Sequence, residues 1–203
     1  MAYLEFVTLE VPNPADAERF YAAAFGLDDR LRLRASDAPT SGFRGFAMSL
    51  VVAQPSTVDS LYGTAADAGA KTLKPVAKSL WGYGGVVQAP DGTIWTIASS
   101  SKKDTGPATR KIDAVVLQLG VQDVAASRRC YVEHGFEVTK SYGGRYVEFS
   151  PPSSPLALSL YKRKALAKVS GVPAEGSGSH RLVIGSDAKP FTDPDGFVWA
   201  PSA

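Results

Sequence analysis

The sequence is poor in residues that bind metals or form disulfides. It has one cysteine, Cys130, so no internal disulfide can form, and its two histidines are His134 and His180. The net charge of +2 is too small to indicate a nucleic-acid-binding surface. No stretch reaches the roughly 18 apolar residues of a membrane span, and residues 1–11 lack the pattern of a signal peptide. We therefore expect a soluble cytoplasmic protein without nucleic-acid or membrane partners.

An internal repeat is the most informative feature that is present. The motif Pro-Asp-Gly-x-x-Trp occurs at residues 90–95 and again at 194–199. Upstream of these copies, residues 18–27 (ERFYAAAFGL) resemble residues 128–137 (RRCYVEHGFE). A spacing of roughly 105 residues is far longer than the unit of a solenoid, which is about 20–50 residues. The repeat therefore indicates a duplicated domain.

The repeat also predicts the domain boundaries. We expect an N-terminal domain at 1–100 and a C-terminal domain at 112–203. The segment between them, 101–111, is polar and rich in chain-breaking residues, which is typical of a linker.

The second domain is shorter than the first. It has no counterpart of the helix predicted at 56–68, so its last module is truncated. We expect the C-terminal strands 180–186 and 196–200 to complete the sheet that residues 3–34 begin. In that case the two ends of the chain fold together.

Local signals place the individual helices and strands. Helices are predicted after the caps Asn13, Ser56 and Asp123, because each precedes an apolar stripe at helical spacing. Asp59 would complete a capping box with Ser56, and a short helix is predicted from residue 162. Apolar runs predict strands at 4–11, 30–34, 45–53, 71–76, 83–89, 93–98, 112–119, 136–141, 145–150, 156–161 and 180–186.

The Pro-Asp-Gly motif predicts a tight turn before the last strand of each domain. Proline sets φ for the turn, and glycine takes the left-handed position that leads into a hairpin. Trp95 and Trp199 follow the two turns and are predicted to be core residues. Cys130 aligns with Phe20 on the core face of a helix, which predicts a buried and inert thiol. His134, at the end of that helix, is predicted on the surface.

The order of several short motifs is more specific than any one of them. A strand and a helix containing Phe-Tyr are followed by a helix end at 67–70 (DAGA), by 81–85 (WGYGG) and by 89–95 (APDGTIW). This order resembles the vicinal oxygen chelate superfamily, which includes glyoxalases, bleomycin-resistance proteins and extradiol dioxygenases. The resemblance covers 3–98 and, in shortened form, 112–200. It implies an α+β fold of duplicated βαβββ modules, whose mixed sheets curl into cups with helices on the convex side.

The resemblance also implies where a metal would be bound. Metal-dependent members carry His or Gln on the first strand of a module and Glu on the last. Residue by residue, these positions fall at Phe6, Ala47, Thr96, Ala114, His180 and Ala200. Only His180 suits a divalent metal. A register shift of two residues offers Glu10, Ser49 and Gln118, which do not form a His/Glu set either, so we expect no metal and no other cofactor.

Aromatic and glycine-rich segments supply candidate ligand contacts. In residues 41–46 (SGFRGF), Arg44 lies between aromatic residues and glycines, a setting that suits an anionic group of a ligand. The alternative is that these aromatic residues only pack a loop and a hairpin. Together with the inward strand positions, the expected ligand-binding residues are Phe6, Arg44, Ser49, Trp81, Tyr83, Thr96, Gln118 and Tyr146.

These features favour a protein of the glyoxalase/bleomycin-resistance type that binds a small organic molecule in an aromatic-lined cup without a metal. The alternative is an enzyme of the same superfamily, of lyase, isomerase or hydrolase type, either metal-dependent or using His180 as a general base. A third interpretation is a fold kept for protein–protein contact, with both cups filled by side chains. Because paired modules in this superfamily often dimerise, we also expect a homodimer.

Overall fold

The computed structural model describes residues 2–26, 28–152 and 154–201, so Leu27 of the first repeat copy lies outside the described residues. The helices are α1 (Pro14–Ala24), α2 (Pro55–Asp67), α3 (Val124–Glu133) and α4 (Arg163–Ser170), with a 3₁₀ turn η1 (Gly143–Arg145). Within the described ranges, every helix is too short or too polar to span a bilayer. The strands are β1 (Leu4–Val11), β2 (Leu31–Ala35), β3 (Thr40–Gly42), β4 (Phe46–Val51), β5 (Lys71–Ser79), β6 (Gly82–Gln88), β7 (Ile94–Ser99), β8 (Ala114–Val121), β9 (Lys140–Ser141), β10 (Tyr146–Phe149), β11 (Ala157–Lys162), β12 (Gly176–Gly178), β13 (Leu182–Ser186), β14 (Phe191–Thr192) and β15 (Val198–Pro201).

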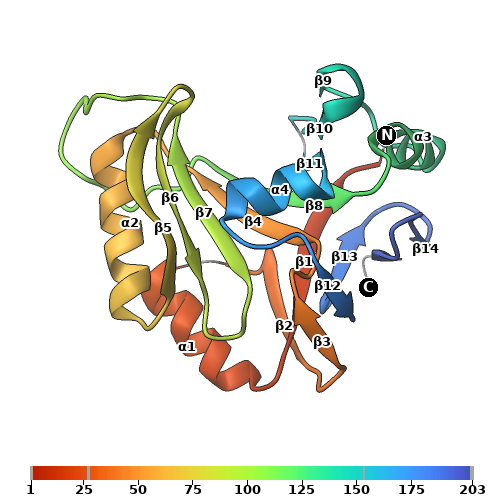
Figure 1. Ribbon diagram of the computed structural model, residues 1–203, viewed down its shortest axis with the longest axis horizontal. Coiled ribbons are helices and arrows are strands. Elements are labelled where there is room, and N and C mark those ends of the chain that lie inside the picture. The colour runs from red at the N-terminus through yellow and green to blue at the C-terminus, as the bar shows by residue number, and fades with distance from the viewer. Residues whose placement is uncertain (1, 27, 153, 202–203) are drawn as a thin grey trace.

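The strands form an eight-stranded sheet, a five-stranded sheet and a small ribbon (Figure 1). The larger sheet has the order β5-β6-β7-β4-β8-β11-β10-β9. Its two halves are βαβββ modules, in which the last strand pairs in parallel with the first: β7 with β4, and β11 with β8. Antiparallel pairing of β4 with β8 joins the modules into one curled sheet.

The five-stranded sheet, with the order β14-β15-β13-β1-β2, combines strands from both ends of the chain. β1 pairs with β13, which confirms that the C-terminal strands complete the N-terminal sheet. Its modules are shortened: one is β1-α1-β2 and the other is β13-β14-β15, which has no helix. β2 lies at the edge of the sheet, in agreement with the alternating pattern of its sequence.

One predicted cap is wrong. Helix α2 begins at Pro55, and its N-cap residue is Gln54, not Ser56; Asp59 completes no capping box. The Gln54 side chain makes no cap hydrogen bond and instead binds the backbone of residues 105–107. The predicted linker is therefore fixed against the start of α2. By contrast, the side chains of the other two predicted caps accept hydrogen bonds from backbone N–H groups of α1 and α3.

The α3 region differs from the prediction because the second half has no helix equivalent to α2. Cys130 is half-exposed where a buried thiol was predicted, and the strand predicted at 136–141 shrinks to β9. β14 lies beside the end of α3, where the Phe191 ring stacks on His134 with 3.7 Å between the ring centroids. Burial raises the pKa of Cys130.

The Pro-Asp-Gly turns join neighbouring modules. Gly92 and Gly196 both have φ of +89°, as the turn requires. The Tyr21 hydroxyl of α1 donates a hydrogen bond to Asp91 at 2.6 Å. In the second half the Tyr131 hydroxyl of α3 donates to Asp193, the residue before the turn, and Ser127 of α3 donates to the turn residue Asp195. In both halves a helix is thus tied to the segment that leads into the last strand of the following module.

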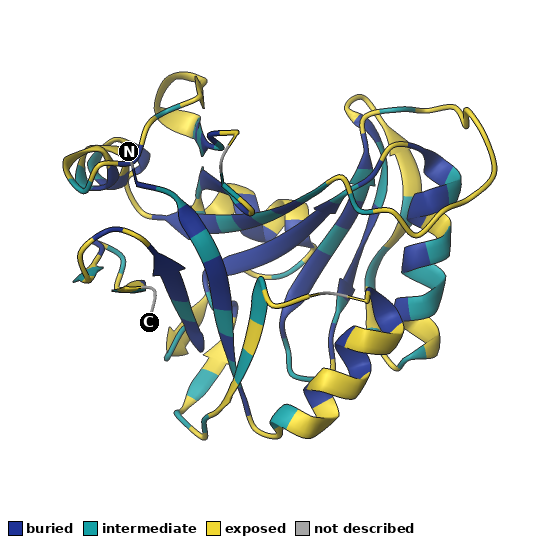
Figure 2. Cartoon of the chain, turned by 180° about the vertical axis from the view of Figure 1, so that it is seen from behind, coloured by how far each residue is buried: buried dark blue, intermediate teal, exposed yellow. Residues whose placement is uncertain are grey.

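One face of each sheet forms a common core with the helices. Trp95 and Trp199 are 0% and 1% exposed, which confirms that they are core residues. Figure 2 shows the same pattern on the helices, whose inner stripes are buried and whose outer faces are exposed. The helices α2 and α3 pack on one side of the eight-stranded sheet, and α4 packs on the opposite side.

Candidate functional site

The face of the eight-stranded sheet opposite α2 and α3 is the inner face of the curl, which we call the cup. Side chains alternate between the two faces of a strand. In β4, Met48 and Leu50 belong to the common core, so Ala47 and Ser49 face the cup. Register then places Thr96 of β7 and Gln118 of β8 on the same face.

Helix α4 crosses the cup and fills part of it. Leu166 and Ala167 are buried against a small apolar cluster on the cup face, which includes Ala47, Val86 and Ile94. The Arg163 guanidinium donates hydrogen bonds to the carbonyl oxygens of Phe43 and Ala174. This residue belongs to the short basic run at 162–164, and its role is to hold the start of α4 in place.

The cup face also carries buried polar side chains, which we call the floor. In the strand register, Ser49 of β4 lies opposite Thr96 of β7, and Gln118 of β8 lies opposite Ser159 of β11. Three buried atoms, Thr96 Oγ1, Gln118 Oε1 and Ser159 Oγ, make no hydrogen bond of standard geometry among the described residues, although the Gln118 and Ser159 side chains lie close enough to Tyr161 to lower the pKa of its hydroxyl. Buried polar atoms are usually paired, so three unpaired atoms on one face are unusual.

An apolar groove borders this floor on the side of the β5–β6 hairpin. It has a volume of about 360 Å³, and Thr96, Ala98, Trp81 and Val169 of α4 are among its lining residues. Trp81 is 85% exposed at the hairpin. The volume lies within the range of small-molecule sites, which is about 300–1,000 Å³.

Tyrosines border the floor on the side of β10 and β11. Tyr146 and Tyr161 face the cup, and their rings meet edge to face at 5.0 Å. The Tyr146 hydroxyl donates a 2.7 Å hydrogen bond to Glu148. Burial raises the pKa of both tyrosines, and the neighbouring Glu148 carboxylate raises it further, so both phenols are neutral near pH 7.

Comparison with solved structures identifies this arrangement. Glyoxalase I from Zea mays superposes with a TM-score of 0.63 at 13% identity, over 99% of this chain and 92% of that one. A candidate dioxygenase from Bacillus subtilis superposes with a TM-score of 0.55 at 12% identity, over 95% of this chain and 71% of that one. The chain has the vicinal oxygen chelate fold. It matches no protein-family model and no curated protein.

In the vicinal oxygen chelate fold seen here, the cup brings together five of the predicted ligand-binding residues. Ser49, Thr96 and Gln118 form the floor, while Trp81 and Tyr146 lie on its two sides. These residues lie far apart in the sequence, and the pairing of β4 with β8 brings the two modules that carry them into one sheet.

Three other predicted ligand-binding residues have different surroundings. Phe6 lies on the five-stranded sheet, where the guanidinium of Arg32 covers its ring at 3.4 Å. Tyr83 contributes to the lining of the groove, but its hydroxyl donates a hydrogen bond to Asp59 of α2, so the end of its ring lies on the helix side of the sheet. Arg44 lines a recess of about 300 Å³ on the other side of α4.

Arg44 and His180 hold the first and second Pro-Asp-Gly turns, respectively. Arg44 donates a 2.6 Å hydrogen bond to the backbone oxygen of Asp91, and burial lowers the pKa of its guanidinium. The two ring nitrogens of His180 contact the backbone oxygens of Arg44 and Asp195, and the ring stacks on Phe197 at 4.0 Å. Because both nitrogens are engaged by backbone, the geometry favours a structural role for His180 over that of a general base.

The sequence of residues 143–149 (GGRYVEF) also offers Glu148 beside Tyr146 as a cup residue, but sequence reasoning missed Ser159 and Tyr161. Both lie on a predicted strand, and their alternation with apolar core residues was a usable signal for the face they occupy. Their proximity to Gln118 depends on the pairing of β8 with β11, which a single sequence does not give.

The residues of the cup do not fit a transition-metal centre. The first-strand and last-strand positions of the two modules present hydroxyls and one amide: Ser49, Thr96, Gln118 and Ser159. Zn, Ni, Mn and Fe are held in proteins mainly by imidazole, carboxylate or thiolate groups, and here Gln118 and the Glu148 carboxylate are joined only by hydroxyls. Nowhere in the described ranges do three or more such side chains converge as a metal site.

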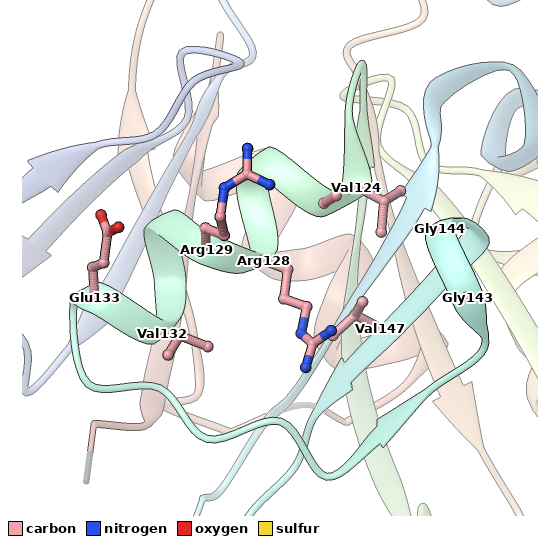
Figure 3. A pocket seen from close by; sticks show the side chains of 9 residues that line it. Val124, Arg128, Arg129, Val132, Glu133, Gly143, Gly144 and Val147 are labelled. Carbon is pink, nitrogen blue, oxygen red and sulfur yellow. The ribbon is translucent and has the colours of Figure 1, made fainter.

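A larger groove lies on the opposite side of the sheet, between α3 and the η1–β10 segment. It measures about 410 Å³, and Figure 3 shows Arg129 and Glu133 directed away from Val147 at its base. The rest of its lining is mostly apolar, with two glycines. Because no unpaired buried polar atom lines this groove in the described part of the chain, we place the candidate site in the cup.

Proposed function

We propose that the protein binds a small organic molecule in the cup of the eight-stranded sheet, without a metal. The observation that carries the proposal is the set of unpaired atoms on the floor: Thr96 Oγ1, Gln118 Oε1 and Ser159 Oγ. An unpaired buried polar atom costs about 1–3 kcal/mol, so a ligand that hydrogen-bonds to these atoms recovers part of that cost.

The two sides of the cup suit the body of such a ligand. Trp81 and Val169 offer apolar contact beside the groove, and the rings of Tyr146 and Tyr161 offer aromatic contact at the other side. A flat molecule with polar substituents matches a polar floor between aromatic walls. The fold of glyoxalase-like proteins supports the location, since this fold places ligands on the concave face. We retain the homodimer and the cytoplasmic location as predictions.

The test is an NMR screen of small, flat aromatic amides and alcohols against ¹⁵N-labelled protein. We expect shifts that map to β4, β7, β8 and β11. The variants Thr96→Val and Ser159→Ala should each weaken the best fragment several-fold, because they remove a hydroxyl from the floor. Thr8→Val is the matched control, since Thr8 lies on the five-stranded sheet. Shifts confined to other surfaces, or equal affinity in all variants, would contradict the proposal.

A further inference from the structure

The tyrosine side of the cup has the composition of a cation site. Tyr146 and Tyr161 meet at 5.0 Å with an angle of 72° between their planes, and Tyr142 lies 5.9 Å from Tyr146. Aromatic faces attract cations within about 6 Å of the ring centroid. Tyr142 is exposed, and the other two rings are half-buried, so all three are accessible from the cup or its rim.

A carboxylate lies beside these rings. In the strand register, Glu148 of β10 lies opposite Ser159 of β11. The two carboxylate oxygens of Glu148 accept hydrogen bonds of 2.7 Å from the hydroxyls of Tyr146 and Ser150. Both donors are neutral hydroxyls. Among the described residues, no Lys, Arg or His nitrogen lies within 4.0 Å of the Glu148 carboxylate. Lys140 of β9 lies directly opposite Glu148, and the Lys140 side chain is exposed.

The floor next to Glu148 adds acceptors. Gln118 Oε1 and Ser159 Oγ are buried and unpaired, and Ser159 is 1% exposed. The Gln118 and Ser159 side chains lie in adjacent register positions on β8 and β11. A carboxylate, an amide oxygen, a hydroxyl and aromatic rings thus converge from neighbouring strands. The carboxylate and the ring faces favour positive charge, and the amide and hydroxyl oxygens can accept hydrogen bonds from a ligand.

We propose that this side of the cup binds an organic cation, whose charged group rests against Tyr146 and Tyr161 beside Glu148. The inference rests on the proposed function of the cup and names the class of ligand. Glu148 supplies the charge, the rings supply the cation–π contact, and the floor acceptors orient any polar substituent. The bound cation would act as the counter-ion of Glu148, which makes no ion pair within 4.0 Å among the described residues.

The test uses three probes of nearly identical shape that differ in charge. Choline is positive, 3,3-dimethyl-1-butanol is its neutral isostere, and 3,3-dimethylbutanoate is negative. Binding is measured by NMR titration, with shifts mapped onto the cup. We expect choline to bind about five- to tenfold more tightly than the neutral probe, which is the order of a partly exposed cation–π contact with a charge partner. The anion should bind most weakly.

Variants separate a local charge effect from a general one. Glu148→Gln should lower the affinity for choline about two- to fivefold, which is the order of a partly exposed ion pair, and leave that for the neutral probe unchanged. Glu133→Gln removes the same charge from α3, on the other side of the sheet, and should change neither. Tyr146→Leu, checked for retained folding, should weaken choline selectively.

Failure of this inference can be distinguished from failure of the proposed function. Equal binding of choline and its neutral isostere in the cup, unaffected by Glu148→Gln, would overturn the cation inference and support the cup as a binding site. Failure of choline to shift any cup resonance would also overturn it, while the fragment screen decides the proposed function independently.

Discussion

Deleting residues 176–203 should unfold the N-terminal half of the chain as well as the C-terminal half. The deletion removes β13 and β15, and with them the only antiparallel partner of β1 in the described sheet. It also removes four buried side chains that are no more than 3% exposed, Leu182, Ile184, Phe197 and Trp199. Without β13 and β15, the core residues that pack against those strands would be exposed to water.

The size of the effect follows from this burial. Burying one large apolar side chain contributes about 1.5–3 kcal/mol, so four contribute roughly 6–12 kcal/mol. The whole free energy of unfolding of a domain is about 5–15 kcal/mol. The loss is therefore comparable with the entire stability of the fold.

The assay is guanidinium denaturation of residues 1–175 and of the full chain, followed by circular dichroism and tryptophan fluorescence. Ile184→Ala in the full chain should cost about 2–5 kcal/mol, as is typical of a buried isoleucine. The matched control Val198→Ala, on the same sheet but 44% exposed, should cost less than about 0.5 kcal/mol. A cooperative transition of residues 1–175 at the midpoint of the full chain would refute the reasoning.

Three further predictions concern packing and pH. Leu166→Ala should cost about 2–5 kcal/mol and speed amide exchange in α4, because it removes the main anchor of that helix; unchanged exchange would contradict this. Gly185→Ala should destabilise by about 1–3 kcal/mol in thermal melts, since a Cβ would overlap the Phe6 ring, whereas an unchanged melting temperature would show that the ring moves freely. Burial raises the pKa of Asp193 above its ordinary value of 3.8, so the folded state binds this proton more tightly. Its contribution to stability is greatest below pH 3.8 and falls as pH rises through the raised pKa, and Asp193→Asn should remove this dependence in urea titrations.

The fold could be read from the sequence because its signals are local and repeated. The caps Asn13 and Asp123 and the Pro-Asp-Gly turns each depend on a few neighbouring residues, and each was confirmed. The cap of α2 was wrong because Pro55 begins the helix and a tertiary contact occupies Gln54. Local pattern does not reveal such contacts.

The site was only partly predictable, because it depends on which strands pair. Inward positions such as Ser49 and Gln118 follow from alternation within a strand. The proximity of Gln118 to Tyr161 depends on the pairing of β8 with β11, and the position of α4 in the cup depends on packing. Tyr83 was expected in the cup, but its hydroxyl reaches Asp59 of α2. In β6 the residues on the cup face are Gly84 and Val86, which lie opposite Ala98 and Thr96, so Tyr83 falls on the other face.

The most direct test of the account is a crystallographic soak of small aromatic amides and alcohols. We predict density in the cup, with a ligand group hydrogen-bonded to at least one of Thr96, Gln118 and Ser159. Fragments bound only in the groove between α3 and β10, or a transition metal held by cup residues, would contradict the claim that the cup is a metal-free binding site.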